Sequence, residues 1–114
     1  MATIQSATIQ GVTAVPVKVT VTAVAGLPTF KCIGLAESMV RETRLRVTSA
    51  LKTSGFDVSL PRHVTAALYP ADLRKESAAL DLPIALAWLA ELGEVPATMF
   101  EGVAAVGELG LDGT

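Results

Sequence analysis

The sequence predicts a single α+β domain, with an early group of strands and two later helices. Val, Ile and Thr are frequent in the first quarter of the chain, where apolar and polar residues alternate as in strands with one buried face. After residue 36 the apolar residues recur at helical spacing, and a second, nearly all-apolar helical segment starts at residue 81. A length of 114 residues suits one compact domain.

Three strands are expected before residue 36, in the segments ATIQSATIQG (2–11), VPVKVTVTAVAGLPTF (15–30) and TFKCIGL (29–35). Apolar and other side chains alternate in the second segment, with Val15, Val17, Val19 and Val21 on one face and Pro16, Lys18 and Thr20 on the other. This alternation predicts that one face of the sheet is buried. Gly11 and the AGLP turn at 25–28 separate the strands.

An amphipathic helix is predicted from Glu37 to Ser54. Its apolar or small positions are Val40, Thr43, Val47, Ala50 and Leu51. Two i,i+4 ion pairs are expected on its surface, Glu37 with Arg41 and Glu42 with Arg46. Gly55 is the expected stop. On the other side of the helix, Arg41, Arg44 and Lys52 lie close to one line, which fits either an ordinary solvated face or a contact surface.

A short buried strand, HVTAALYP (63–70), is expected next, followed by a polar stretch and a second helix, DLPIALAWLAELG (81–93). Asp81 stands where an N-cap belongs, worth about 1 kcal/mol. Pro83 falls in the first turn, where its missing N–H costs little. The chain then closes with GVAAVGELGLDGT (102–114), which predicts a strand followed by an Asp-Gly turn. Because a returning strand would lie beyond Thr114, we expect the chain to be a fragment of a longer protein.

The composition excludes several classes of function. No apolar run approaches the roughly 18 residues that span a bilayer, and the N-terminus lacks a signal peptide, so a cytoplasmic protein without membrane contact is expected. Cys32 is expected to be a small buried hydrophobe, and one His with one Cys cannot build a zinc site. With a net charge of −2, any contact with nucleic acid must come from a local cluster of the nine Lys and Arg residues.

Lys75 and Ser77 raise the question of a Ser–Lys nucleophile. Such a pair needs the amine within hydrogen-bond reach of the hydroxyl, in surroundings that lower the pKa of the lysine. Proximity in the sequence supplies neither condition. A phosphate-binding G-x-x-x-x-G-K-[ST] loop is absent from the chain, so ATP binding of that kind is not expected here.

Three ordered motifs carry a resemblance to a known family: GLPTFKCIGLAESMVRETRLRVTSALKTSGF (26–56), YPADLRKESAALDLPIAL (69–86) and GELGLDG (107–113). Together they resemble the N-terminal domain of the Mg-chelatase-like AAA+ ATPases of the ComM/YifB type, over nearly the whole chain from Ile9 to Gly113. The resemblance implies a Lon protease-like domain over residues 1–114. Its expected fold is the two-layer ribosomal protein S5 domain 2-like fold, a mixed sheet with two main helices. The AAA+ ATPase core, with its ATP and Mg²⁺, would follow residue 114.

The likeness to Lon also bears on catalysis. When VGELGLDG (106–113) is laid on the corresponding Gly-Glu strand of Lon, the place of Lon's nucleophilic serine falls on Asp81, which cannot attack a peptide carbonyl. Lon's partner lysine would lie beyond Thr114. Ser77 replaces the glycine more usual in the family's KEG motif. We therefore expect no catalytic residue, no metal site and no cofactor in this chain, and expect Asp81 to act as a helix cap.

In this family the resemblance implies hexameric ATPases that migrate DNA branches during recombination in natural transformation. By analogy the chain would be a non-catalytic module for ring assembly with copies of itself and for contact with DNA. The residues expected to contact DNA are Arg41, Arg44, Lys52, Arg74 and Lys75. Three alternatives remain: an active Lon-like Ser–Lys peptidase, a purely structural scaffold, and a subunit that takes part in magnesium insertion into a porphyrin.

Overall fold

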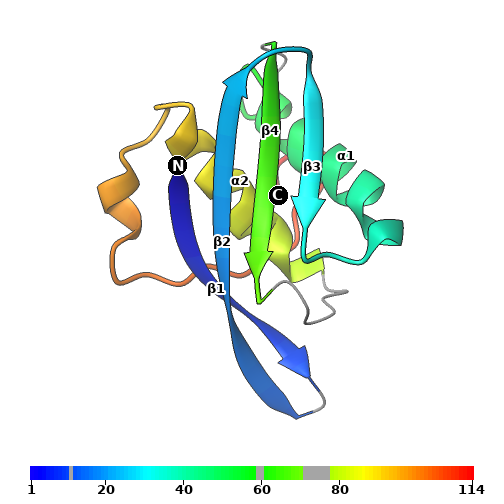
Figure 1. Cartoon of the computed structure of the whole chain (residues 1–114), viewed down its shortest axis with the longest axis vertical. Helices are drawn as coiled ribbons and strands as arrows, with labels where there is room; N and C mark the ends of the chain where they lie inside the picture. The colour runs from blue at the N-terminus through cyan, green and yellow to red at the C-terminus, as the bar shows by residue number, and fades with distance from the viewer. Residues whose placement is uncertain (11, 59–60, 71–77) are drawn as a thin grey trace.

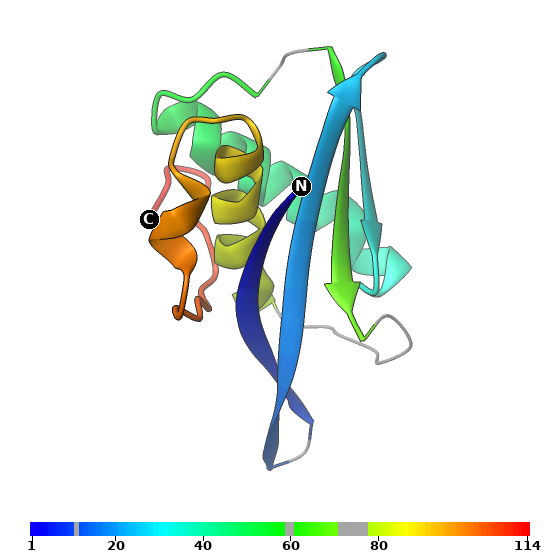
Figure 2. The ribbon, with the colours of Figure 1, turned by 60° about the vertical axis from the view of Figure 1, so that its left-hand side comes forward.

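The chain folds into two layers, a four-stranded mixed sheet with helices on one face (Figures 1 and 2). A computed structural model describes residues 1–10, 12–58, 61–70 and 78–114. The elements are β1 (Ala2–Gln10), β2 (Thr13–Ala25), β3 (Thr29–Ile33), α1 (Glu37–Thr53), β4 (Arg62–Tyr69), the 3₁₀ helix η1 (Ala78–Leu80), α2 (Asp81–Glu91) and the 3₁₀ helix η2 (Ala97–Phe100). The expected α+β class, the four strands up to residue 70 and both main helices are confirmed.

The strands stand in the order β1-β2-β4-β3. β1 and β2 form an antiparallel hairpin in which Gln10 lies opposite Thr13, and β2 pairs antiparallel with β4. β3 and β4 pair in parallel, with Thr29 opposite His63. α1 connects these two parallel strands, as a parallel pair requires a crossover.

The core lies between the sheet and the helices. Val17, Val19 and Val21 of β2 have no exposed surface, as the alternation predicted. α1 contributes Val47 and Leu51 to the same core, and α2 is buried over most of its circumference. α2 therefore fills the centre of the helical layer against β1 and β2, while α1 keeps an open side.

The expected end of α1 is confirmed. The helix stops at Thr53, and Gly55 follows with a φ of 95°, a left-handed conformation that glycine adopts without strain. Of the two predicted ion pairs, Glu42 and Arg46 approach to 3.9 Å. Glu37 and Arg41 form no such pair in the part of the chain that the structure describes.

The predicted strand at 102–114 was wrong. Only a single bridge forms, between Gln5 and Ala104, and the Ala105 N–H donates to the Gln5 carbonyl at 2.9 Å. Four glycines in this stretch of thirteen residues disfavour a regular strand. The turn itself is present, because the Gly113 N–H donates to the Gly110 carbonyl at 3.0 Å. Residues 102–114, called the C-terminal segment below, run from the edge of β1 to α2 and α1.

Gly26 is required by a close approach in the turn between β2 and β3. A Cβ at this position would lie 2.2 Å from Nε2 of His63, whose Nδ1 is 2.8 Å from the Thr29 hydroxyl. We expect Gly26→Ala to lower the free energy of unfolding by about 1–3 kcal/mol, because the imidazole must move and lose this hydrogen bond. Urea denaturation measures the change. In a His63→Ala background the same substitution should cost far less; an equal cost in both backgrounds would contradict this explanation.

Candidate nucleic-acid interface

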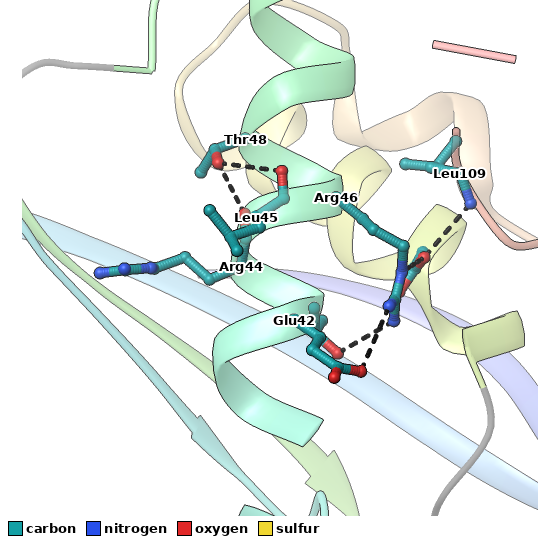
Figure 3. A network of polar contacts seen from close by, with 8 residues as sticks. Glu42, Arg44, Leu45, Arg46, Thr48 and Leu109 are labelled. Carbon is teal, nitrogen blue, oxygen red and sulfur yellow. Dashed lines mark hydrogen bonds and ion pairs between the residues drawn. The ribbon is translucent and has the colours of Figure 1, made fainter. Parts of the chain in front are cut away.

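The basic side of α1 is exposed, which both interpretations of the sequence, a solvated face and a contact surface, require. Arg41, Arg44 and Lys52 all have exposed side chains, while Thr43, Val47, Ala50 and Leu51 face the core. Figure 3 shows Arg44 extending from α1 away from Arg46, which points toward α2 and the C-terminal segment. The helical period of α1 thus places Arg41, Arg44 and Lys52 on its exposed side, while Arg46 lies on the side that faces α2.

Three adjoining hollows, of about 340, 120 and 370 Å³, lie along the free side of α1. Phe30 and Arg44 line both the first and the second, and Thr48 and Val58 line both the second and the third. We call this continuous depression between α1, β3 and the loop after α1 the α1 groove. The three cations predicted on α1 all line it: Arg41 and Arg44 in the first hollow, and Lys52 in the last.

Arg62 is a fourth cation of the α1 groove, and the sequence analysis missed it. It lines the middle hollow together with Arg44. Arg62 begins β4, and the parallel pairing of β3 with β4 brings this end of β4 next to the start of β3 and to α1. The residues paired between β3 and β4 lie 34 apart in the sequence, so their pairing leaves no local signal. Only the position of Arg62 directly before a predicted strand could have drawn attention to it.

More positive than negative side chains line the groove. Arg41, Arg44, Lys52 and Arg62 stand against two carboxylates, Glu37 and Asp57, in a chain whose total charge is −2. Two guanidinium groups in one hollow suit phosphate oxygens, since each can donate two parallel N–H bonds. The wall of the groove also contains an aromatic pair, Phe30 stacked on Trp88 with ring centroids 5.6 Å apart. The groove can therefore attract an anionic backbone and offer apolar surface beside it.

Two further predicted contacts, Arg74 and Lys75, lie outside the described residues, as does Ser77. The structure thus brings together three of the five cations predicted to contact DNA and leaves the other two unplaced.

Asp81 is not the helix cap that the sequence suggested. The N-cap of α2 is Leu80, without a side-chain cap hydrogen bond, because η1 runs directly into α2 and gives Leu80 a helical backbone. Asp81 is instead the first residue of the helix, with only 1% of its surface exposed. Its carboxylate accepts hydrogen bonds from Nε and Nη2 of Arg46 at 2.6 and 3.2 Å, and from the Leu109 N–H at 3.2 Å (Figure 3).

This network, which we call the Arg46–Asp81 pair, joins α1, α2 and the C-terminal segment. The hydrogen bond to Asp81, with the charges of Asp81, Glu108 and Glu42, raises the pKa of the Arg46 guanidinium above its ordinary value, against the opposing effect of burial. Arg46 is thereby held away from the α1 groove. At the position that the resemblance to Lon assigns to its serine, the chain has a buried carboxylate engaged in an ion pair, a group with no hydroxyl for attack on a peptide bond.

Neither Cys32 nor the described acidic residues and histidine form a site for chemistry. Cys32 is half-buried and packs at the margin of the core. Within residues 1–10, 12–58, 61–70 and 78–114, no group of three His, Cys, Asp or Glu side chains could hold a metal ion. Nor does any helix in those ranges have the length and apolar character needed to cross a bilayer.

ATP and Mg²⁺, which the resemblance assigns to an ATPase core, do not fit these residues. The chain has no Gly-rich phosphate loop with its lysine, and the described acidic residues form no ligand cluster. The α1 groove is lined by Arg41, Arg44, Lys52 and Arg62, whose positive charges can attract anions.

Comparison with known proteins gives one family match and several relatives. The family described as subunit ChlI of Mg-chelatase matches residues 17–114. The uncharacterized protein YifB is 43% identical over 103 residues in both Salmonella typhimurium and Escherichia coli, covering 90% of this chain and 20% of YifB. The competence protein ComM of Haemophilus influenzae is 41% identical over 88 residues, covering 77% of this chain and 17% of ComM. The chain thus spans about a fifth of the length of these relatives.

Proposed function

Because this chain belongs to the family of the Mg-chelatase subunit ChlI, in its ComM/YifB type, we propose that it is a non-catalytic assembly and DNA-interaction domain. It would serve a larger AAA+ ATPase that migrates DNA branches in recombination or natural transformation. The observation that carries the DNA part is the α1 groove, in which four cations gather on a chain of net negative charge.

The proposed contact is electrostatic and independent of base sequence. Arg41 and Arg44 would hold phosphate oxygens of a duplex, with Lys52 farther along the groove and Arg62 across it. Each neutralised phosphate releases condensed counterions, so affinity falls steeply as salt rises. A few contacts from one copy give weak binding, but a ring of copies around one duplex multiplies them. This accounts for how an acidic domain could serve a DNA motor.

The family relatives support the recombination part of the proposal. The Haemophilus influenzae relative is named a competence protein, and it shares 41% identity with the chain over 88 residues, or 77% of the chain. The parent protein's ATPase activity, ring formation and cytoplasmic location are parts of the same proposal. The name of the chelatase family would otherwise suggest tetrapyrrole chemistry, for which the described residues offer no metal cluster.

We expect the double substitution Arg41→Gln and Arg44→Gln to weaken duplex binding at least about tenfold and to reduce the salt slope of log K by about 2, since up to two phosphate contacts are lost. Fluorescence anisotropy of a labelled duplex, titrated at several salt concentrations, gives both quantities. It should be measured with this chain and with the full-length protein.

The matched control is Val12→Glu with Thr13→Glu, which changes the net charge by the same amount at two exposed positions at the start of β2, away from the groove. If the two variants weaken binding equally, only the overall charge matters and the α1 groove is not the contact. If neither has any effect on binding by the full-length protein, the domain acts as a structural scaffold without DNA contact.

A further inference from the structure

Outside the α1 groove, two surfaces of the molecule carry charges of opposite sign. None of the Asp and Glu residues that the structure describes lies in a strand, whereas β2 and β3 carry Lys18 and Lys31. From residue 76 to residue 114 the reverse holds, because this stretch contains no Lys, Arg or His. Its exposed carboxylates include Glu94, Glu101 and Glu108.

The cationic surface is the face of the sheet opposite the helices, which we call the open sheet face. Strand register and burial place Lys18 next to Tyr69 on this face, with the amine 5.3 Å from the ring centroid. Lys31 stands on the edge strand β3, two residues before Ile33. Ile33 and Tyr69 are about half exposed, with 50% and 45% of their surfaces open. In Figure 1 this face looks toward the viewer, and no described element covers it.

The acidic surface lies on the helical side of the molecule. Residues 94–103, which include η2, follow α2 and carry Glu94 and Glu101, both exposed. Met99 and Val103 lie between and beside them, with 61% and 47% of their surfaces exposed. We call this stretch the η2 surface. Figure 2 shows it separated from β4 and β3 by α2 and the remaining strands, so the two surfaces of one copy cannot meet each other.

We propose that the open sheet face of one copy binds the η2 surface of the next copy in a head-to-tail contact. Each surface combines half-exposed apolar side chains with charges of a single sign, and the signs are opposite, which is the complementarity that sets register between partners. Two open sheet faces would repel each other, as would two η2 surfaces, so a two-fold dimer through either surface is disfavoured. A contact between two different surfaces repeats from copy to copy and closes into a ring where the rotation allows it.

This contact deepens the assembly part of the proposed function and is independent of the α1 groove, since it uses none of the groove's cations. The test compares two variants of the chain, Lys18→Glu with Lys31→Glu, and Glu94→Lys with Glu101→Lys. In the first variant both surfaces are acidic, and in the second both are basic. Each variant alone should self-associate at least about tenfold more weakly than the unmodified chain, because like charges then face each other.

Mixing the two variants should restore association to near the level of the unmodified chain, since every surface of one variant is complementary to a surface of the other. Sedimentation equilibrium at low salt, without DNA, measures all three samples up to millimolar concentration. An unmodified chain that stays monomeric under these conditions overturns the proposal. So does a mixture that associates no better than its separate components. Loss of DNA binding in the groove variants would leave this result unchanged, so the two proposals can fail separately.

Discussion

Replacing Arg46 with Met should lower the free energy of unfolding by roughly 3–5 kcal/mol, the cost of leaving a buried carboxylate without its partner. Asp81 is 1% exposed and would retain only the Leu109 N–H as a donor among the contacts described above. The methionine keeps most of the aliphatic volume of Arg46, so the loss comes mainly from the unpaired charge. Urea denaturation followed by circular dichroism gives the change.

The asymmetry of the Arg46–Asp81 pair supplies the control. Arg46 keeps 19% of its side chain exposed, so after Asp81→Asn the guanidinium can still reach water, and this variant should lose less stability than Arg46→Met. Combining Arg46→Met with Asp81→Leu should recover part of the loss, since apolar pairs often replace buried ion pairs without cost. If the double variant is as unstable as the sum of its parts, the pair is not the source of the effect. Asp81→Ser should likewise destabilise the fold without creating peptidase activity.

Replacing Trp88 with Ala should lower the free energy of unfolding by about 3–5 kcal/mol, because a large buried side chain is removed and the cavity closes only in part. Trp88 is 3% exposed, packs in the main core and stacks on Phe30. The same substitution removes the support of the wall of the α1 groove. We therefore expect duplex binding to weaken as well, at temperatures where the variant remains folded.

Trp88→Phe separates the two effects. A phenylalanine fills much of the same space and can still stack on Phe30, so we expect a loss of stability well below that of the alanine variant. Duplex binding should then remain close to that of the unmodified chain. Because Trp88 is the only tryptophan of the chain, its fluorescence in the unmodified protein also reports whether DNA changes the surroundings of the groove wall. A Trp88→Ala variant with unchanged stability would contradict the placement of this side chain in the core.

The sequence predicted those parts of the fold that depend on local periodicity. The valines of β2 and the apolar positions of α1 follow the periods of a strand and a helix, and both elements formed at the expected places. The C-terminal segment failed this test, because its apolar residues suggested a strand while its glycines and its contacts with β1, α2 and α1 determine an irregular path. Local propensity was outweighed there by tertiary contacts.

Some features of the candidate site could likewise be predicted from local spacing, and others depend on contacts between distant parts of the chain. The line of Arg41, Arg44 and Lys52 is a property of one helix and could be read from spacing alone. The contribution of Arg62 depends on parallel pairing between distant strands. The role of Asp81 depends on Arg46, 35 residues earlier, and on a 3₁₀ turn that moved the start of the helix. An aspartate at the start of a helix is often a cap, which is why the sequence predicted one. A carboxylate in this position can also pair with a cation, and in this fold Asp81 pairs with Arg46.

The path of the C-terminal segment has a mechanical consequence. It is fastened at successive points: Ala105 to Gln5 of β1, Gly107 to Ala79 and Leu82, Leu109 to Asp81, and Leu111 to the hydroxyl of Thr53. Tension applied at Thr114 would therefore load these attachments one after another, beginning at the end of α1 and reaching the edge of the sheet last. The segment would peel away in steps while the ladders among β2, β4 and β3 stayed intact, since none of the attachments involves them. The first step to yield lies beside α1, so strain at this end of the chain is felt first by the helix that carries the groove.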